Sequence, residues 1–182
     1  GRKRLEVRGY HSPWLAAVDD AGLHVQKQEG KVDGLRNSLN GASMAGTTGI
    51  GHTRWATHGA PNDVNAHPHV SSDGAFALVH NGIIENHGVI KKRLGEKGYT
   101  FQSETDTEVL VKLIEEVKRA THLSLPESLR QALTQVVGAY GISVVSRADP
   151  DLLIAARNGS PLILGVGDGE YFVGSDAAPL LG

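Results

Sequence analysis

Hydrophobic and polar positions near the start of the chain follow the pattern of β-strands. Strands are predicted over Trp14–Val18 and Leu23–Gln28, and the residues Asp19–Gly22 between them predict a hairpin turn. A third strand is expected over Thr47–His52, after a short helix over Val32–Leu39 and a small polar loop. Strands therefore dominate this part of the chain.

The middle of the chain changes to the spacing of amphipathic helices. A helix is predicted over Asp106–Ala120, where apolar residues recur at the intervals of one helical face: Leu110, Leu113, Ile114 and Val117. Another is expected over Asn86–Gly98, with Gly98 as its stop signal. A third runs from Ser124 to about Val137 and begins with a capping box formed by Ser124 and Glu127.

The last third of the chain returns to short apolar runs. They are Ala139–Ser146, Leu152–Arg157, Leu162–Val166 and Tyr171–Gly174. Turn residues separate them: Pro150-Asp151, Asn158-Gly159 and Asp168-Gly169. This spacing predicts an antiparallel meander. Strands at both ends of the chain, with helices between them, indicate two packed sheets with helices outside.

Composition limits the classes of function. The chain has 182 residues, which suits one domain, and its net charge of −2 indicates no general attraction to nucleic acid or to an anionic membrane. No apolar run approaches the roughly 20 residues needed to span a bilayer, and no signal peptide is visible. The chain contains no cysteine, so it has no disulfide, no thiolate metal site and no thiol nucleophile of its own.

Two short stretches, Gly49–Gly59 and His80–Asn86, do not fit an ordinary core. In the first, polar and amphipathic side chains crowd together: His52, Thr53, Arg54, Trp55, Thr57 and His58. The second continues a predicted strand over Phe76–His80 and contains the turn pair Asn81-Gly82. Such a pair presents a side-chain amide beside a bare backbone N–H, which is the chemistry of an anion or oxyanion site.

These stretches, with Asn65–His69 (NAHPH) and Ser103–Val109 (SETDTEV), resemble in this order the glutaminase domain of the glutamine–fructose-6-phosphate aminotransferases. That family belongs to the class II glutamine amidotransferases, which are N-terminal-nucleophile hydrolases. The resemblance covers the chain from Leu5 to the last strand. It implies an α+β fold, a four-layer αββα sandwich of two antiparallel sheets, and a single glutaminase domain over residues 1–182.

The beginning of the chain departs from the family. There, the nucleophilic cysteine is the first residue of the mature protein, and a buried strand and a helix precede a segment like Leu5–Tyr10. The resemblance therefore implies a truncated domain without its nucleophile, its first strand and most of its first helix. His11–Trp14 also replaces the family's usual Asp-Ser-Ala-Gly. Either the strand starts at Leu15, with Pro13 at its edge, or the mouth of the site is reshaped.

Amide hydrolysis produces a tetrahedral oxyanion, which is stabilised by donors aimed at the developing charge. The Asn81 amide and the Gly82 N–H are such donors, and the family assigns them this oxyanion-hole role; a simple type I′ turn is the alternative. The planar fork of Arg54 suits a carboxylate. The resemblance makes Arg54 hold the α-carboxylate of glutamine, with Thr57 and His58 nearby, whereas an internal salt bridge is the alternative.

The resemblance assigns three further residues. In the family the residue matching Asp106 anchors the substrate α-ammonium, although an aspartate at a helix start is also a common N-cap. Arg8 aligns with an arginine that lines the same pocket. Trp55 is either a packed aromatic or, as in the family, part of a loop that closes over glutamine and helps gate the exit of ammonia.

Histidines are frequent in the middle of the chain, and the pair His67 and His69 with Asp106 invites comparison with a metal site. No helical i, i+4 pair and no cysteine supports one. We therefore expect no metal and no organic cofactor. Most of these histidines are expected to shape loops through hydrogen bonds.

The resemblance implies a reaction that releases ammonia from the glutamine amide and leaves glutamate. In the family a thiol attacks the amide, its own α-amino group acts as base, and ammonia passes to a sugar-phosphate isomerase domain that makes glucosamine 6-phosphate from fructose 6-phosphate. That second domain is not in this chain. The implied partners are glutamine or glutamate and the isomerase domain of a full-length, cytoplasmic homodimer. The 182 residues alone are expected to be inactive, because they lack the thiol.

Two other classes of function stay open. The chain could be a non-catalytic module that binds glutamine or glutamate. It could also be a histidine-ligated metallohydrolase, which metal analysis of the purified protein would identify.

Overall fold

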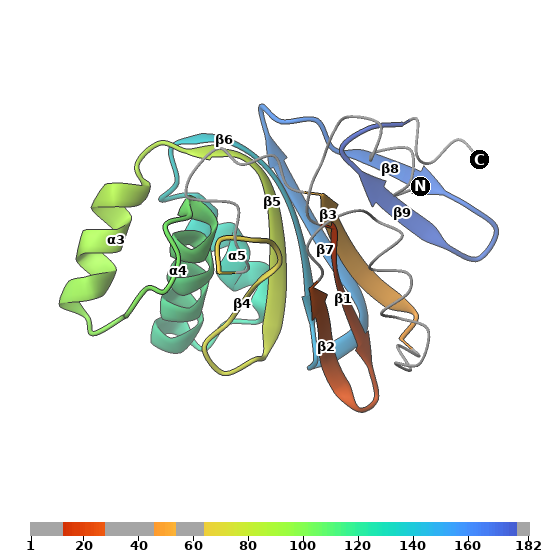
Figure 1. The fold of residues 1–182 in the computed structure, drawn as a ribbon, viewed down its shortest axis with the longest axis horizontal. Coiled ribbons are helices and arrows are strands. Elements are labelled where there is room, and N and C mark those ends of the chain that lie inside the picture. The colour runs from red at the N-terminus through yellow and green to blue at the C-terminus, as the bar shows by residue number, and fades with distance from the viewer. Residues whose placement is uncertain (1–12, 28–45, 54–63, 178–182) are drawn as a thin grey trace.

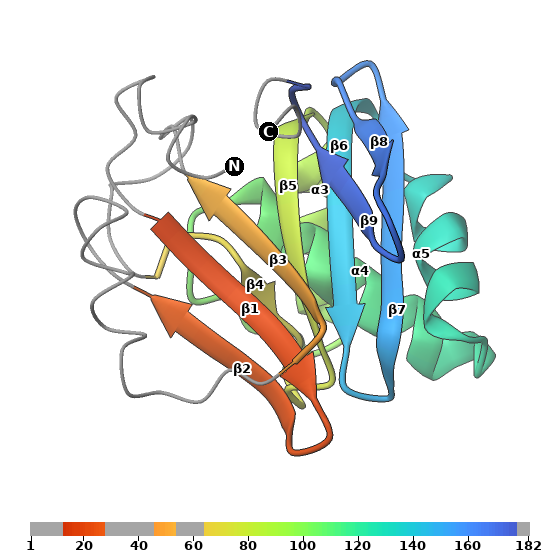
Figure 2. The same ribbon diagram turned by 90° about the vertical axis from the view of Figure 1, so that its right-hand side faces the viewer.

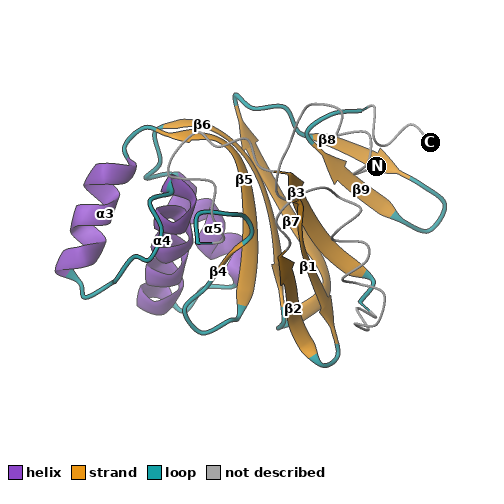
Figure 3. Ribbon diagram, in the orientation of Figure 1, coloured by secondary structure: helices purple, strands orange, loops and turns teal. Residues whose placement is uncertain are grey.

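The centre of the fold consists of two antiparallel sheets packed face to face, with helices on the outer side of the larger sheet (Figure 1). The structure, a computed structural model, describes residues 13–27, 46–53 and 64–177. Colouring by secondary structure separates the helical layer from the strands (Figure 3). The helix expected over Val32–Leu39 lies outside the described residues.

The smaller sheet contains the predicted hairpin and the third predicted strand. Its strands are β1 (Pro13–Asp19), β2 (Gly22–Lys27) and β3 (Thr48–Thr53), in the order β2-β1-β3. The hairpin prediction is confirmed, and the turn is closed by the Asp19 carboxylate, whose Oδ1 accepts the N–H groups of Ala21 and Gly22 at 2.8 and 3.1 Å. All pairings in this sheet are antiparallel.

The sequence left open that the first strand starts at Leu15, but β1 begins earlier. It begins at Pro13, and Trp14 lies within the strand with no exposed surface. Trp14 shares a face of β1 with Ala16 and Val18, which are both buried. The bulky residue is therefore part of the packed layer between the sheets, rather than a surface residue ahead of the strand.

The larger sheet has the order β4-β5-β6-β7 (Figure 2). Its strands are β4 (His69–Val70), β5 (Phe76–Ile84), β6 (Gly138–Ser146) and β7 (Asp149–Asn158). The prediction that β5 ends at His80 is wrong. The strand continues through Asn81 and Gly82, which pair with Gly141 and Tyr140 of β6. The type I′ turn alternative for Asn81-Gly82 is therefore wrong as well.

The last third of the chain is antiparallel, but it is not one continuous meander. Strands β8 (Ile163–Val166) and β9 (Tyr171–Gly174) pair with each other in a separate two-stranded sheet. The turn between β6 and β7 lies at Arg147-Ala148, and Pro150 is inside β7. Proline is tolerated in a strand where its missing N–H is not needed for the ladder, so it was a misleading turn signal here.

Three helices cover one face of the larger sheet: α3 (His87–Glu96), α4 (Asp106–Thr121) and α5 (Leu125–Leu133). The predictions of these three helices are confirmed, although α5 ends before Val137. The Asn86 side chain explains the early end, because it accepts the Val137 N–H at 3.0 Å and donates to the Gln135 carbonyl at 2.9 Å. No described helix is both long enough and apolar enough to cross a membrane.

The alternation of side chains along β5 divides the core into two layers. Phe76 and Leu78 pack with the helices, whereas Ala77 and Val79 pack against the smaller sheet. The helical layer includes the predicted apolar face of α4: Leu110, Leu113, Ile114 and Val117. Strand β5, like its neighbour β6, therefore contributes to both layers of the core.

Glu116 on α4 joins two helices through charged hydrogen bonds. Its carboxylate accepts Lys97 Nζ at 2.5 Å, Arg119 at 2.6 Å and the Tyr99 hydroxyl at 3.1 Å. The hydrogen bond from Lys97 is the main reason that the pKa of Glu116 is lowered from 4.5 to about 2; burial opposes this effect, and Arg119 and Tyr99 add to it. The ionised carboxylate therefore stabilises the connection between α3 and α4.

We predict that Glu116→Gln lowers the free energy of unfolding at neutral pH by about 1–2 kcal/mol, a modest amount because Lys97 and Arg119 are solvent-screened. The folded-state pKa lies below the ordinary value, so this contribution is present above pH 4.5 and is lost as the pH falls toward 2. Urea denaturation of parent and variant at several pH values measures the difference. Glu96→Gln, at an exposed position of α3, is the control, and an equally pH-dependent effect there would contradict the assignment.

Candidate functional site

The structure brings three of the predicted site residues together. Asn81 and Gly82 lie in the second half of β5, and Asp106 opens α4, whose first turn packs on that half. The other predicted residues lie outside the described residues: Arg8, Arg54, Trp55, Thr57 and His58. The described part of the candidate site is therefore the junction of β5 with the first turn of α4 and the end of β3.

Asn81 is an exposed residue with one fixed contact. Its Oδ1 lies 2.7 Å from Nε2 of His52, at the end of β3 in the other sheet. An amide oxygen only accepts hydrogen bonds, so Nε2 carries the proton and donates. The sequence alone did not identify this contact, although His52 lies two residues after the buried Ile50 and therefore on the same face of β3.

Gly82 has a backbone conformation that other residues rarely adopt. Its φ is +131°, and a Cβ placed there would lie 2.0 Å from the Ala139 carbonyl oxygen and 3.0 Å from Ser160 Oγ. Both the φ angle and the neighbouring strand β6 therefore require glycine.

Asp106 is not the N-cap of α4. That position belongs to Thr105, whose hydroxyl accepts the Glu108 N–H at 3.2 Å. Asp106 is the first helical residue, is 5% exposed, and accepts the backbone N–H of Ile84 through Oδ2 at 2.8 Å. A carboxylate at a helix start also interacts favourably with the helix dipole. Asp106 therefore joins the start of α4 to the end of β5.

A buried group of histidines and threonines surrounds this junction. The Thr107 hydroxyl hydrogen-bonds to Nε2 of His67 at 2.8 Å and to Nδ1 of His80 at 3.0 Å. The Thr105 hydroxyl hydrogen-bonds to Nε2 of His69 at 2.9 Å. These three histidines therefore fasten β4, the segment before it and β5 to the start of α4.

The electrostatics of the junction favour a neutral His80 and an ionised Glu108. Burial lowers the pKa of His80, and the Asp106 carboxylate and the Ala139 carbonyl only partly oppose this. Burial raises the pKa of Glu108, but the Ser103 hydroxyl and the N–H groups of Gln102 and Ser103 hold it below its ordinary value. In the described part of the chain, no group of three histidine or carboxylate residues is arranged to hold a metal ion.

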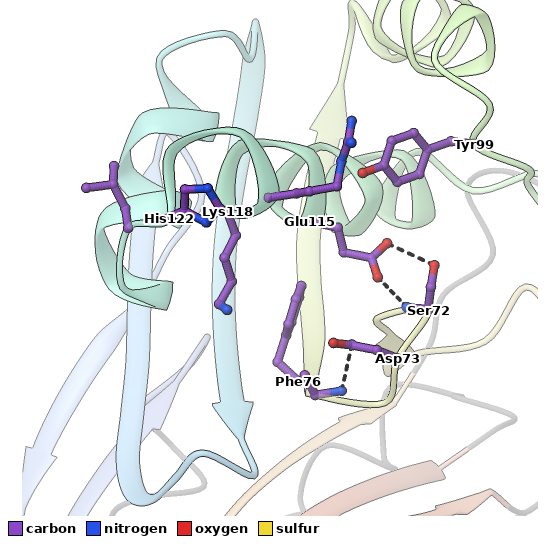
Figure 4. A pocket seen from close by; sticks show the side chains of 10 residues that line it. Ser72, Asp73, Phe76, Tyr99, Glu115, Lys118 and His122 are labelled. Atoms are coloured by element: carbon purple, nitrogen blue, oxygen red, sulfur yellow. Dashed lines mark hydrogen bonds between the residues drawn. The ribbon is translucent and has the colours of Figure 1, made fainter.

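A separate cavity of about 530 Å³ lies on the helical side, between the β4–β5 turn and the second half of α4 (Figure 4). Within it the Glu115 carboxylate accepts the backbone N–H and the hydroxyl of Ser72, the latter at 3.1 Å. Lys118 extends from α4 toward Phe76. Neither Asn81, Gly82 nor Asp106 lines this cavity, so it is distinct from the candidate site.

Comparison with protein families gives one match over most of the chain. Residues 52–182 match the model of the glutamine amidotransferase domain. This region contains Asn81, Gly82 and Asp106, and it includes every described element after the first part of β3. The match therefore includes the whole described part of the candidate site.

Curated relatives are similar over the full chain. Identity is 50% over 182 residues to glutamine–fructose-6-phosphate aminotransferase (isomerizing) of Bacteroides thetaiotaomicron, and 52% over 185 residues to that of Chlorobaculum tepidum. The same enzyme of Thermus thermophilus is 50% identical over 181 residues. The comparison covers 100% of this chain but only 30%, 30% and 29% of these relatives, so the chain spans less than a third of their length.

Two solved structures share the fold. One is the glutamine phosphoribosylpyrophosphate amidotransferase of B. subtilis in complex with ADP and GMP, with a TM-score of 0.79 and 28% identity over 97% of this chain and 38% of that one. The other is described as the allosteric regulatory enzyme of purine biosynthesis, with a TM-score of 0.79 and 29% identity over 96% of this chain and 37% of that one. The expected class of fold, an αββα sandwich, is confirmed.

We predict that Gly82→Ala destabilises the protein by about 2–4 kcal/mol, because it combines an unfavourable φ with a clash against β6. The matched control is Gly98→Ala, whose φ is also positive, at +90°, but whose added Cβ would meet nothing within 4 Å. That control should lose only about 1 kcal/mol. Chemical denaturation measures both, and equal losses would show that the Ala139 carbonyl does not restrict position 82.

Proposed function

The chain belongs to the glutamine amidotransferase family, and we propose that it is the glutaminase domain, residues 1–182, of a glutamine–fructose-6-phosphate aminotransferase. In this proposal the domain hydrolyses the side-chain amide of glutamine and releases ammonia. A separate sugar-phosphate isomerase domain of the same full-length protein uses the ammonia to convert fructose 6-phosphate to glucosamine 6-phosphate. No metal or organic cofactor takes part.

The observation that carries the proposal is the Asn81-Gly82 pair on an exposed part of β5. The side-chain oxygen of Asn81, Oδ1, accepts a hydrogen bond from His52 Nε2 at 2.7 Å. The Nδ2 end of the side-chain amide is therefore the end left for a ligand. The neighbouring residue Gly82 contributes its backbone N–H and has no side chain. Two donors of this kind suit the oxyanion of a tetrahedral intermediate, because its charge appears on oxygen only as the amide is attacked.

Asp106 supports the proposal from the adjacent helix. Its Oδ2 accepts the Ile84 N–H, while among the described residues its Oδ1 has only a long contact of 3.4 Å with the Thr107 hydroxyl. An α-ammonium group is a suitable partner for this second oxygen. Arg54, Thr57, His58, Trp55 and Arg8 complete the proposed glutamine pocket, with Arg54 on the α-carboxylate.

The nucleophile is proposed to be a cysteine thiol supplied from outside these 182 residues, which contain no cysteine. The absence of a cysteine favours a second candidate function for the chain by itself, as a module that binds glutamine or glutamate without chemistry. A homodimer and a cytoplasmic location of the full-length protein stay predictions from the resemblance.

We predict that the 182-residue chain releases no ammonia from glutamine above background, because it has no thiolate to attack the amide. A full-length protein with a cysteine at its mature N-terminus should release ammonia and form glutamate. A coupled ammonia assay on both proteins tests this. Turnover by the 182-residue chain alone would show that the thiol mechanism is wrong.

We predict that Arg54→Ala and Asp106→Asn each weaken the binding of glutamate to the full-length protein by roughly 2–5 kcal/mol, because each leaves a charged group of the ligand unpaired. Asparagine at position 106 keeps an oxygen for the Ile84 N–H, so the fold should be retained. Glu127→Gln, an acid in the first turn of α5 that bonds to Ser124, is the control. Calorimetry measures the affinity for glutamate. If both variants bind glutamate as tightly as the parent does, Arg54 and Asp106 do not anchor the ligand.

A further inference from the structure

The side-chain amide of Asn81 has two ends with opposite properties. Its Nδ2 donates hydrogen bonds, whereas its Oδ1 only accepts them. An oxyanion is stabilised by the donor end and repelled by the acceptor end. An asparagine in an oxyanion site therefore needs a contact that determines which end faces the ligand.

His52 makes that contact. Its Nε2 lies 2.7 Å from Asn81 Oδ1, and the oxygen can only accept, so the ring donates its Nε2 proton. Among the described residues this is the one hydrogen bond of the Asn81 side chain. With the proton on Nε2, rotation of the amide by 180° would place a second donor against the ring and abolish the bond. The contact thus specifies one orientation, with Nδ2 directed away from His52.

The fold places the two residues opposite each other for a simple geometric reason. Side chains two residues apart point to the same face of a strand. His52 therefore follows Ile50 on β3, and Asn81 follows Val79 on β5, on the faces that form the apolar layer between the sheets. The hydrogen bond joins the two sheets at the end of this layer.

The position of the His52 ring is itself restricted. Trp14, which has no exposed surface, is its direct cross-strand partner on β1. The ring of His67 lies 4.5 Å away between centroids, tilted by 48°, and His67 is fastened to Thr107 at 2.8 Å. The bulky Trp14 and the first turn of α4 therefore both limit the freedom of the residue that orients Asn81.

We propose that His52 is a positioning residue for the oxyanion site: it acts through Asn81, holding its amide with the donor end toward the ligand. The inference rests on the proposed function. His52 does not touch the reacting atoms. Its removal leaves the amide free to present either end, so the transition state loses stabilisation while binding of the ground state is retained.

The test compares steady-state glutamine hydrolysis by the full-length protein and its variants. His52→Phe keeps a ring of similar size but cannot donate, and kcat should fall roughly 10–100-fold with KM little changed, as expected for a misplaced catalytic group. His52→Gln has an amide that can donate to Asn81 Oδ1, and it should recover most of the lost rate. His24→Phe, the same substitution on β2 away from the site, should leave kcat unchanged.

A double-mutant cycle separates positioning from general loss of structure. Asn81→Ala should lower kcat roughly 100–1000-fold, and adding His52→Phe to it should lower kcat no further, because the residue through which His52 acts is gone. Melting temperatures are measured for every variant. Should His52→Phe fail to fold, His52→Glu, a polar residue that cannot donate when ionised, replaces it with the same expected loss.

The outcomes are distinguishable from failure of the proposed function. If the parent full-length protein does not hydrolyse glutamine, the proposed function is wrong. If the parent is active and a folded His52→Phe or His52→Glu variant keeps the parental kcat, the positioning role is wrong. Equal fold-losses from His52→Phe in the parent and in the Asn81→Ala background would also overturn it, since they would show that His52 acts independently of Asn81.

Discussion

The docking of the first turn of α4 onto the second half of β5 is the interaction on which the candidate site depends. Three successive residues take part: Thr105 bonds to His69, Asp106 to the Ile84 N–H, and Thr107 to His67 and His80. A buried polar group that loses its partner costs about 1–3 kcal/mol. The contacts therefore support one another, and the helix start, the strand and the segment before β4 hold a common geometry.

Strand β5 separates two environments that meet at the site. His80 points toward the helices and is 4% exposed, whereas its neighbour Asn81 points toward the smaller sheet and bonds to His52. On the smaller-sheet face the apolar layer ends at Asn81, whereas on the helical face His80 makes a buried polar contact and Ile84 continues the apolar layer. This is why a polar, ligand-accessible position can exist on a strand that contributes to both layers of the core.

Local pattern was sufficient to predict the helices and the first hairpin. The apolar spacing of Leu110, Leu113, Ile114 and Val117 has no competing interpretation, and it predicted α4 to within one residue. The extension of β5 could not be predicted in this way. Asn81-Gly82 carries a turn signal, and only pairing with Tyr140 and Gly141, about sixty residues later in the chain, makes it part of a strand. The contact between His52 and Asn81 was missed for the same reason, since it joins different sheets.

Asp106 shows how one side chain can satisfy both the fold and a proposed ligand. Oδ2 completes the hydrogen bonding of the β5 backbone at Ile84, which requires an acceptor but no charge. Within the described part of the chain the other oxygen has only a 3.4 Å contact, to Thr107, and the proposed function assigns it to the ligand. The charge itself also interacts favourably with the dipole at the start of α4. In the proposed function the same charge also binds the α-ammonium of glutamine, and the docking of α4 places it beside the end of the strand that carries Asn81 and Gly82.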